Sequence, residues 1–412
     1  MRAICLFFLL THSFVEVSYS QEIVPVYSLA QVTEDFDYYI NTLRTNHPNL
    51  YAFVSEDYFN KEVEKARSML TDSMDTFEFW RTLMPLQHCL DGHSGMLSID
   101  LISACGSQIV EKIFYDAFFL YPDSITYNEI FMNGMKVVSI NGMEAQKIIH
   151  ELDRCIQAEE NQKLRLCRLR GCFPSLIYNM LKLTPPYKIV YQGENGEEIE
   201  RTEIGIRDRF TDIDKVFTGI PLDYKLYPKE SIAYLEVNSF SLPDLAKDGL
   251  IETFQKTLDT LFVEKKINDY KYLFIDISKN TGGGDGPVLA LFNKLQHDTV
   301  VVVDKKSGKY IYPQVTTGYS GPVFVITGHW TYSAAHLFYL LMKNSRRGIL
   351  VGEPPGHYYQ VYAPLVDYKL PNTNWPFSCA KNAREFEVDI TPDIPWSIDC
   401  FNETFTLDDL KK

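Results

Sequence analysis

The sequence predicts an α/β fold whose second half is built on a parallel β-sheet. Its apolar strands are continuous rather than alternating, as in strands that are buried on both faces. Helices separate these strands, and such alternation is typical of a parallel sheet with right-handed crossovers. Ligand sites in these sheets lie at the carboxyl ends of the strands. We expect strands at 232–237, 272–277, 323–326 and 349–351, and helices at about 250–262 and 333–343.

A helical module is predicted before this core, over residues 21–95. Large apolar side chains recur there at helical spacing, for example Phe36, Tyr39 and Leu43. The segment 47–51, which contains a proline, is expected to break the helical run.

A small α+β module is predicted between the helical module and the core, over residues 96–225. Short β-like runs at 136–140 and 187–191 each end in a turn sequence. One helix, at about 161–183, separates the two runs. The core then occupies residues 226–412.

The first 20 residues have the features of a secretory signal. Arg2 precedes an apolar stretch, and small residues come just before Gln21. We therefore expect removal of residues 1–20 and an exported protein, periplasmic or secreted. No later segment offers about 20 uninterrupted apolar residues, so no membrane span is expected.

The net charge and the cysteine content limit the classes of partner and cofactor that we expect for this protein. The net charge of −14 disfavours nucleic acid or an anionic membrane surface as the main partner. Of eight cysteines, Cys5 lies in the signal, which leaves an odd seven, and none has the spacing of a zinc site. We expect no metal or other cofactor. A disulfide Cys379–Cys400, or one within Cys155–Cys172, is an open alternative to buried thiols.

The first chemical signal is Ser333, which lies where a buried strand gives way to a helix. A hydroxyl at that point benefits from the positive end of the helix, and the amide of Ala334 points toward the same space. The alternative is a purely structural role, in which the side chain of Thr331 or Ser333 caps the helix.

The second signal is a glycine-rich segment, Asp276–Gly286, at the end of another buried strand. Successive glycines allow backbone amides to face an anion or oxyanion without obstruction by a Cβ. The spacing fits neither a dinucleotide fingerprint nor a phosphate loop. A plain flexible loop is the alternative.

The third signal is His93, which stands between two glycines on a predicted turn. A single histidine in such a place is more often structural than catalytic. Its competitors are His88, His329, His336 and His357, and the ring of His336 is expected to point along its helix, away from the hydroxyl of Ser333.

Four segments taken together resemble the tail-specific, or C-terminal-processing, serine peptidase family. They are Asp276–Gly283, Thr331–Ala335, Val351–Gly356 and Ile390–Ile394, in the family's order. Residues Gly134–Gly142 resemble part of that family's PDZ-like module. The resemblance covers most of the mature chain. It implies a ClpP/crotonase-like core, a PDZ-like α+β module and no cofactor.

The resemblance also implies site residues. The family's lysine position is taken here by His357, whereas His93 matches the histidine of the tricorn-core-like, Ser-His branch. One departure is that Gly92 stands where tricorn-core members have a serine. The resemblance places an orienting acid at Glu387, with Glu385 and Asp389 as alternatives that would share one face of a presumed strand. Gly283 and Ala334 would form the oxyanion hole.

These observations predict an exported serine peptidase, a hydrolase that acts on a peptide or protein substrate through an acyl-enzyme. A catalytically inactive ligand- or peptide-binding member of the same fold is the alternative, since retinoid-binding proteins of the eye resemble this fold. Acyl-CoA chemistry is a third reading, because the core resembles crotonases. The oligomeric state is left open.

Overall fold

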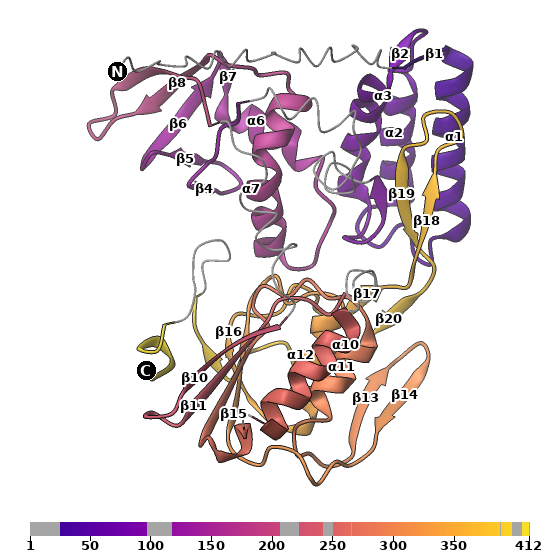
Figure 1. Ribbon diagram of the computed structural model, residues 1–412. Helices are drawn as coiled ribbons and strands as arrows, with labels where there is room; N and C mark the ends of the chain where they lie inside the picture. Colours follow the sequence, from indigo (N-terminus) through magenta and orange to yellow (C-terminus); the bar gives the residue numbers. More distant parts are fainter. Residues whose placement is uncertain are drawn as a thin grey trace, which may run out of the picture.

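The computed structural model describes residues 25–96, 118–206, 222–241, 250–264, 266–387, 389–397 and 406–411. These residues form two halves (Figure 1), the upper one with the N-terminal and middle modules and the lower one with the parallel-sheet core. The predicted signal at 1–20 lies outside the described residues, as do Cys105 and Cys400.

The N-terminal module is helical, as predicted. Ser28 caps α1 in a capping box with Gln31, and α1 ends at Asn46, directly before the predicted break. The elements of this module are β1 (Val26–Tyr27), α1 (Leu29–Asn46), α2 (Glu56–Arg67), β2 (Met74–Asp75), α3 (Thr76–Leu83), the 3₁₀ helix η1 (Met84–Cys89) and β3 (Gly95–Met96).

The middle module combines an antiparallel sheet with two helices. The sheet has the order β4-β5-β6-β8-β9, and β7 pairs with β6. Strands β6 and β8 and helix α7 lie where they were predicted, whereas α6 was not expected. The elements are β4 (Ser124–Ile125), β5 (Ile130–Met132), β6 (Met135–Ile140), β7 (Met143–Glu144), α6 (Ala145–Asp153), α7 (Gln162–Asn179), β8 (Tyr187–Gln192) and β9 (Glu198–Glu203).

The core contains the predicted parallel sheet. Its order is β10-β11-β12-β15-β16-β21, in which only β10 runs antiparallel to its neighbour. The elements up to the helix that follows Ser333 are β10 (Leu222–Tyr227), β11 (Ile232–Val237), α10 (Leu250–Asp259), the π turn η2 (Thr260–Glu264), the 3₁₀ turn η3 (Ile267–Asp269), β12 (Tyr272–Asp276), α11 (Asp285–Phe292), β13 (Val300–Asp304), β14 (Gly308–Tyr312), β15 (Val323–Thr327) and α12 (Ala334–Ser345).

The remaining core elements are short strands: β16 (Ile349–Gly352), β17 (Gln360–Tyr362), β18 (Leu365–Lys369), β19 (Pro376–Ala380), β20 (Ala383–Glu385), β21 (Ile394–Pro395) and the 3₁₀ turn η4 (Asp409–Lys411). Each predicted core strand and helix is present with ends within a few residues of expectation. The presumed strand through the acidic candidates is shorter than expected, because β20 ends at Glu385.

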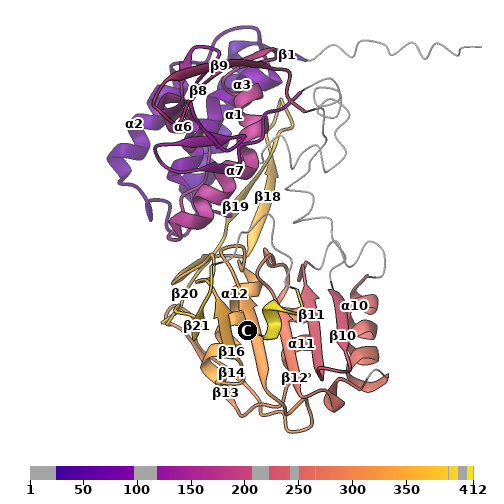
Figure 2. The same cartoon turned by 90° about the vertical axis from the view of Figure 1, so that its left-hand side faces the viewer.

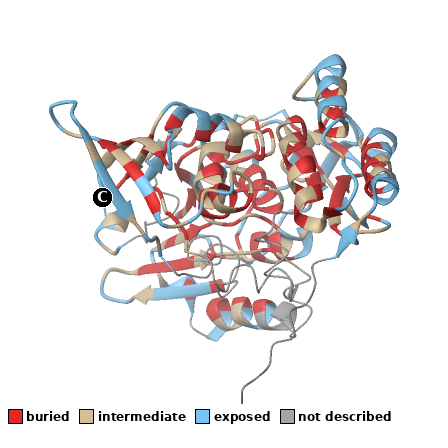
Figure 3. Cartoon of the chain, turned by 90° about the horizontal axis from the view of Figure 1, so that it is seen from above, coloured by how far each residue is buried: buried red, intermediate tan, exposed pale blue. Residues whose placement is uncertain are grey.

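Helix α12 is buried along its whole length up to Met342. It packs against α11 and against strands β15 and β16, and its side chains share one apolar cluster with those of the sheet. Figure 3 shows buried residues gathered where helices and sheets face one another, with exposed residues on the outer surfaces. Close packing therefore holds the beginning of α12 in a defined position.

Strands β18 and β19 form a hairpin that leaves the core and rises into the upper half (Figure 2). Trp375 and Phe377 are buried in the apolar cluster of the N-terminal module, where Trp375 packs on Trp80. The buried carboxylate of Asp35 accepts hydrogen bonds from the backbone amides of residues 372 and 373, each of 2.8 Å. Although this hairpin lies in the range assigned to the core, its side chains complete the helical module.

Candidate active site

Ser333 stands on a strained turn between β15 and α12. Its φ of 51° and ψ of −118° are rare for a residue with a side chain, and such strain is common at functional positions. The turn is held by Thr331, whose hydroxyl donates to the carbonyl of Ile277 at 2.9 Å. No capping hydrogen bond is made by the Ser333 side chain, and the Thr331 hydroxyl is used inside the turn. The capping alternative therefore does not account for this serine.

The glycine-rich segment lies directly against Ser333. Gly282 has a φ of 110°, and a Cβ there would come within 2.6 Å of the Ser333 Cβ. A Cβ on Gly283 would overlap the backbone of Phe240. Hydrogen bonds join Phe240 to the carbonyl of Gly282 (2.8 Å) and to the amide of Gly284 (2.5 Å). These two bonds make a parallel bridge between Phe240 and Gly283 that uses the groups on either side of Gly283, so the Gly283 amide itself is not bonded to Phe240.

A pocket of about 250 Å³ opens beside Ser333. Gly283 and Ala334, the two predicted oxyanion donors, both line it. The structure thus brings the nucleophile candidate and both donors to one cavity at the carboxyl end of the sheet, where the sequence predicts a ligand site.

His93 lies on the turn between η1 and β3. Its backbone amide donates to Asp91 Oδ1 at 2.9 Å, and Asp91 Oδ2 contacts His47 Nε2 at 2.7 Å. Burial alone would raise the pKa of Asp91, but hydrogen bonds from His47 and Ser94 outweigh it and hold the pKa below its usual value. Asp91 thus fixes the turn as a buried carboxylate.

The imidazole of His93 is neutral at pH 7. Burial lowers its pKa to about 4, and the positive charge of Arg168 adds to the fall against the opposing effect of Asp91. Its Nδ1 is buried and has no hydrogen-bond partner among the described residues. A neutral imidazole of this kind can accept a proton.

Ser333 and His93 are brought together around Tyr332 and His357. The ring of His93 stacks on Tyr332 at 4.9 Å and lies 5.0 Å from the ring of His357. The Ser333 amide donates to His357 Nδ1 at 3.1 Å. No hydrogen bond joins the Ser333 hydroxyl to His93 in the described structure, so one further residue separates them.

His357 was noted in the sequence as a competitor of His93 and as the occupant of the family's lysine position. In the structure it lies between Ser333 and His93. Burial, together with His93 and His336 nearby, holds its pKa well below the usual value, so its ring is neutral. Because Nδ1 accepts the Ser333 amide, the proton of the neutral ring must be on Nε2.

A buried polar cluster, formed by Glu159, Arg168 and Tyr332, lies behind His93. The Tyr332 hydroxyl donates to Glu159 Oε1 at 2.6 Å, and Arg168 Nη1 pairs with the same oxygen at 2.6 Å. Burial raises the pKa of Glu159 to about 7 against the opposing effect of Arg168. A Cβ on Gly92 would overlap all three side chains. The glycine at this position therefore has a steric cause that the sequence alone could not reveal.

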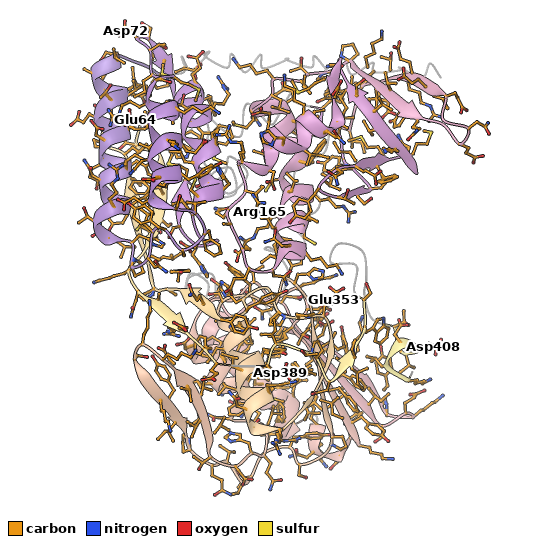
Figure 4. The ribbon with its side chains drawn as sticks, turned by 180° about the vertical axis from the view of Figure 1, so that it is seen from behind. Glu64, Asp72, Arg165, Glu353, Asp389 and Asp408 are labelled. Carbon is orange, nitrogen blue, oxygen red and sulfur yellow. The ribbon has the colours of Figure 1, made fainter. Side chains whose placement is uncertain are left out.

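The start of α7 ties the middle module to the loop that carries His357. Asn161 Nδ2 donates to the carbonyl of Pro355 at 2.9 Å, and the amide of Tyr359 donates to Glu160 Oε2 at 2.9 Å. Lys163 pairs with Glu353, which Figure 4 labels at the junction of the two halves. The site is thus assembled from all three modules.

The three acidic candidates do not contact His93. Glu385 pairs with Lys305 at 3.3 Å, and Glu387 is exposed. Asp389 lies in the lower half (Figure 4), 3.5 Å from Lys343. Since β20 ends at Glu385, these residues do not share one strand face as expected. Asp91, two residues before His93, is the carboxylate beside the turn.

The described residues contain no cluster of three or more side chains suited to a metal ion. Among the described helices, none is long and apolar enough to cross a membrane. No disulfide joins Cys155 to Cys167 or Cys172.

Comparison with known proteins adds a family and a fold. The sequence profile of peptidase family S41 matches residues 231–395. Among solved structures, a serine-to-alanine mutant of CPAF has a TM-score of 0.56 at 11% identity, covering 89% of this chain and 93% of that one. Mature CPAF complexed with lactacystin gives 0.51 at 11% identity, over 89% and 94%. The photosystem II D1 C-terminal processing protease gives 0.45 at 12% identity, over 89% and 93%. Among curated proteins, no sequence matches.

Proposed function

Because the chain is a member of peptidase family S41, a family of serine peptidases, we propose that it hydrolyses peptide bonds with Ser333 as nucleophile and His93 as general base. The observation that carries this proposal is the strained turn that presents Ser333 over the glycine-rich segment, with the neutral imidazole of His93 stacked on the adjacent Tyr332.

The proposed reaction is acyl transfer to water. His93 takes the proton of the Ser333 hydroxyl, whose oxygen attacks the peptide carbonyl. The amides of Gly283 and Ala334 stabilise the oxyanion that forms. The leaving amine takes the proton from His93, and a water molecule then hydrolyses the acyl-enzyme by the same steps. The acid product leaves, and the Ser333 oxygen takes the proton back from His93, which restores the free enzyme.

His93 fits the role of base better than the nearer His357. The Nδ1 lone pair of His357 is engaged by the Ser333 amide, and its Nε2 carries the proton, so neither nitrogen is free to accept one. The ring of His93 keeps an unengaged nitrogen. Catalytic hydrogen bonds are often long before substrate binds. For this one to form, His357 must leave its place between Ser333 and His93, so the proposal includes a rearrangement of the site when substrate binds.

Orientation of His93 is assigned here to Asp91, which holds the turn through the His93 amide. The role of Glu387 as orienting acid stays a prediction, and it requires the exposed segment near β20 to move toward His93. The PDZ-like character of the middle module and its binding of peptide are also proposals, supported by its antiparallel sheet with two helices.

Export is proposed from the first 20 residues alone. The test is N-terminal sequencing of the protein after expression with its own leader. A mature chain that begins at Gln21 supports export, and an intact N-terminus in the cytoplasm contradicts it.

A fluorophosphonate probe tests the nucleophile. Labelling is expected on the peptide that contains Ser333 and is expected to vanish in Ser333→Ala. Ser345→Ala removes a serine at the other end of the same helix and should leave labelling intact. A folded wild-type protein that resists the probe and cleaves no peptide would favour the inactive, ligand-binding alternative.

A further inference from the structure

His336 is a buried histidine that the proposed reaction does not use. It lies in the first turn of α12, three positions after Ser333, and its side chain is 0% exposed. Both ring nitrogens lack a hydrogen-bond partner among the described residues. Two unsatisfied polar atoms in a buried ring are unfavourable unless a ligand or an ordered water pairs with them.

His336 lines the same pocket as Ser333 and Ala334. The sequence predicted that its ring points along the side of the helix, away from the Ser333 hydroxyl, and the structure places the residue in the wall of the pocket beside Ser333. The other walls present apolar side chains, including Leu337, Val361 and Phe386, beside a nearly equal polar surface. With about 250 Å³, the pocket lies below the roughly 300–1,000 Å³ of sites for drug-sized ligands and suits one amino acid side chain.

The rim of the pocket carries no unpaired charge. Arg384 and Asp285 both line it and face each other with 3.5 Å between Nη1 and Oδ2. A charged substrate side chain would have to compete with this pair. The pocket therefore selects by shape and by neutral hydrogen bonding rather than by charge.

We propose that His336 forms the floor of the subsite for the side chain on the acyl side of the cleaved bond, and that this subsite prefers tyrosine. This inference rests on the proposed function, since it is the carbonyl held over Ser333 and Ala334 that places its side chain in this pocket. A neutral imidazole offers one donor and one acceptor, and a tyrosine hydroxyl can serve either. The apolar walls hold the aromatic ring.

The preference is measured with peptide substrates that differ only at the acyl-side residue. The tyrosine substrate is expected to have a kcat/KM about tenfold above that of phenylalanine, the value of one neutral hydrogen bond. In His336→Phe this ratio should fall to about one or below, with phenylalanine still cleaved. His297→Phe replaces a buried histidine outside the pocket, stacked on Phe292, and should keep the wild-type ratio.

Equal cleavage of the two substrates by the wild type, or an unchanged ratio in His336→Phe, would overturn the proposal. If His336→Phe does not fold, the same question is put to Ser333→Ala by titration calorimetry with peptides that end in tyrosine or phenylalanine. Tighter binding of the tyrosine peptide supports the subsite, and equal affinity refutes it. Because this binding measurement requires no turnover, it can refute the tyrosine preference of the subsite independently of whether the protein hydrolyses peptides.

Discussion

Replacement of Gly92 by serine tests the coupling between the buried cluster of Glu159, Arg168 and Tyr332 and the proposed catalytic groups, Ser333 and His93. Judged by side-chain volume alone, the exchange of glycine for serine is a small one. In this chain, however, the new Cβ would overlap Glu159 Oε1, the Tyr332 hydroxyl and Arg168. None of these atoms can retreat easily, because Glu159 and Tyr332 are buried and bonded to each other at 2.6 Å.

The expected losses of stability and of activity follow from that overlap. Extra atoms in a packed interior cost about 1–3 kcal/mol of stability. If Tyr332 gives way, it displaces the ring of His93 stacked on it at 4.9 Å and the backbone of Ser333 next to it. A misplacement of about 1 Å in a catalytic group lowers the rate by roughly 100-fold. We therefore expect kcat/KM to fall by about two orders of magnitude, mainly through kcat.

The assay is peptide hydrolysis by Gly92→Ser beside the thermal midpoint of unfolding. Gly286→Ala is the matched control, since a Cβ there meets open space. It should keep wild-type activity and stability. A folded Gly92→Ser protein with a wild-type kcat/KM would refute the reasoning, because it would show that the cluster can rearrange without disturbing His93.

Four further predictions concern His93, the carboxylate beside it and the hairpin. Because the pKa of His93 is lowered to about 4, the acid limb of the kcat/KM profile should lie well below pH 6.5; a limb near 6.5 would contradict a buried base. The unfolded state binds more protons below pH 6.5, so the free energy of unfolding should decline from pH 6.5 toward 4, as denaturant titrations at each pH would show. Asp91→Asn should lower kcat/KM by about 100-fold and Glu387→Gln by less than about threefold, and the reverse order would make Glu387 the orienting acid. Trp375→Ala should cost about 3–5 kcal/mol in denaturant unfolding, whereas a loss below about 1 kcal/mol would mean that the hairpin is not part of the N-terminal core.

The sequence predicted those features of the structure that depend on residues close together in the chain. The strands of the core and helix α12 follow from continuous apolar runs, and Ser333 was found from its place at a strand-to-helix junction. The break after α1 follows from a proline that cannot continue a helix. These features depend on residues close together in the chain.

Contacts between residues that are far apart in the chain could not be predicted from the sequence. The role of Gly92 depends on Glu159 and Arg168, and nothing near Gly92 in the sequence signals that cluster. His336 lines a pocket whose other wall includes Val361 of β17 and Phe386 just after β20, and nothing near His336 in the sequence signals these neighbours. The alternation of Glu385, Glu387 and Asp389 suggested a strand, yet β20 ends before it can bring them to one face.

The hairpin of β18 and β19 has a consequence for the order in which the molecule becomes complete on the ribosome. The Ser94 hydroxyl beside His93 is bonded by the amide of Ala380, 286 positions later, and β3 pairs with β19. At about 5–20 residues per second, translation of that interval takes on the order of 15–60 s. Throughout it, the turn that carries His93 lacks its supporting strand, so the nascent chain cannot cleave its neighbours before its own synthesis is nearly finished.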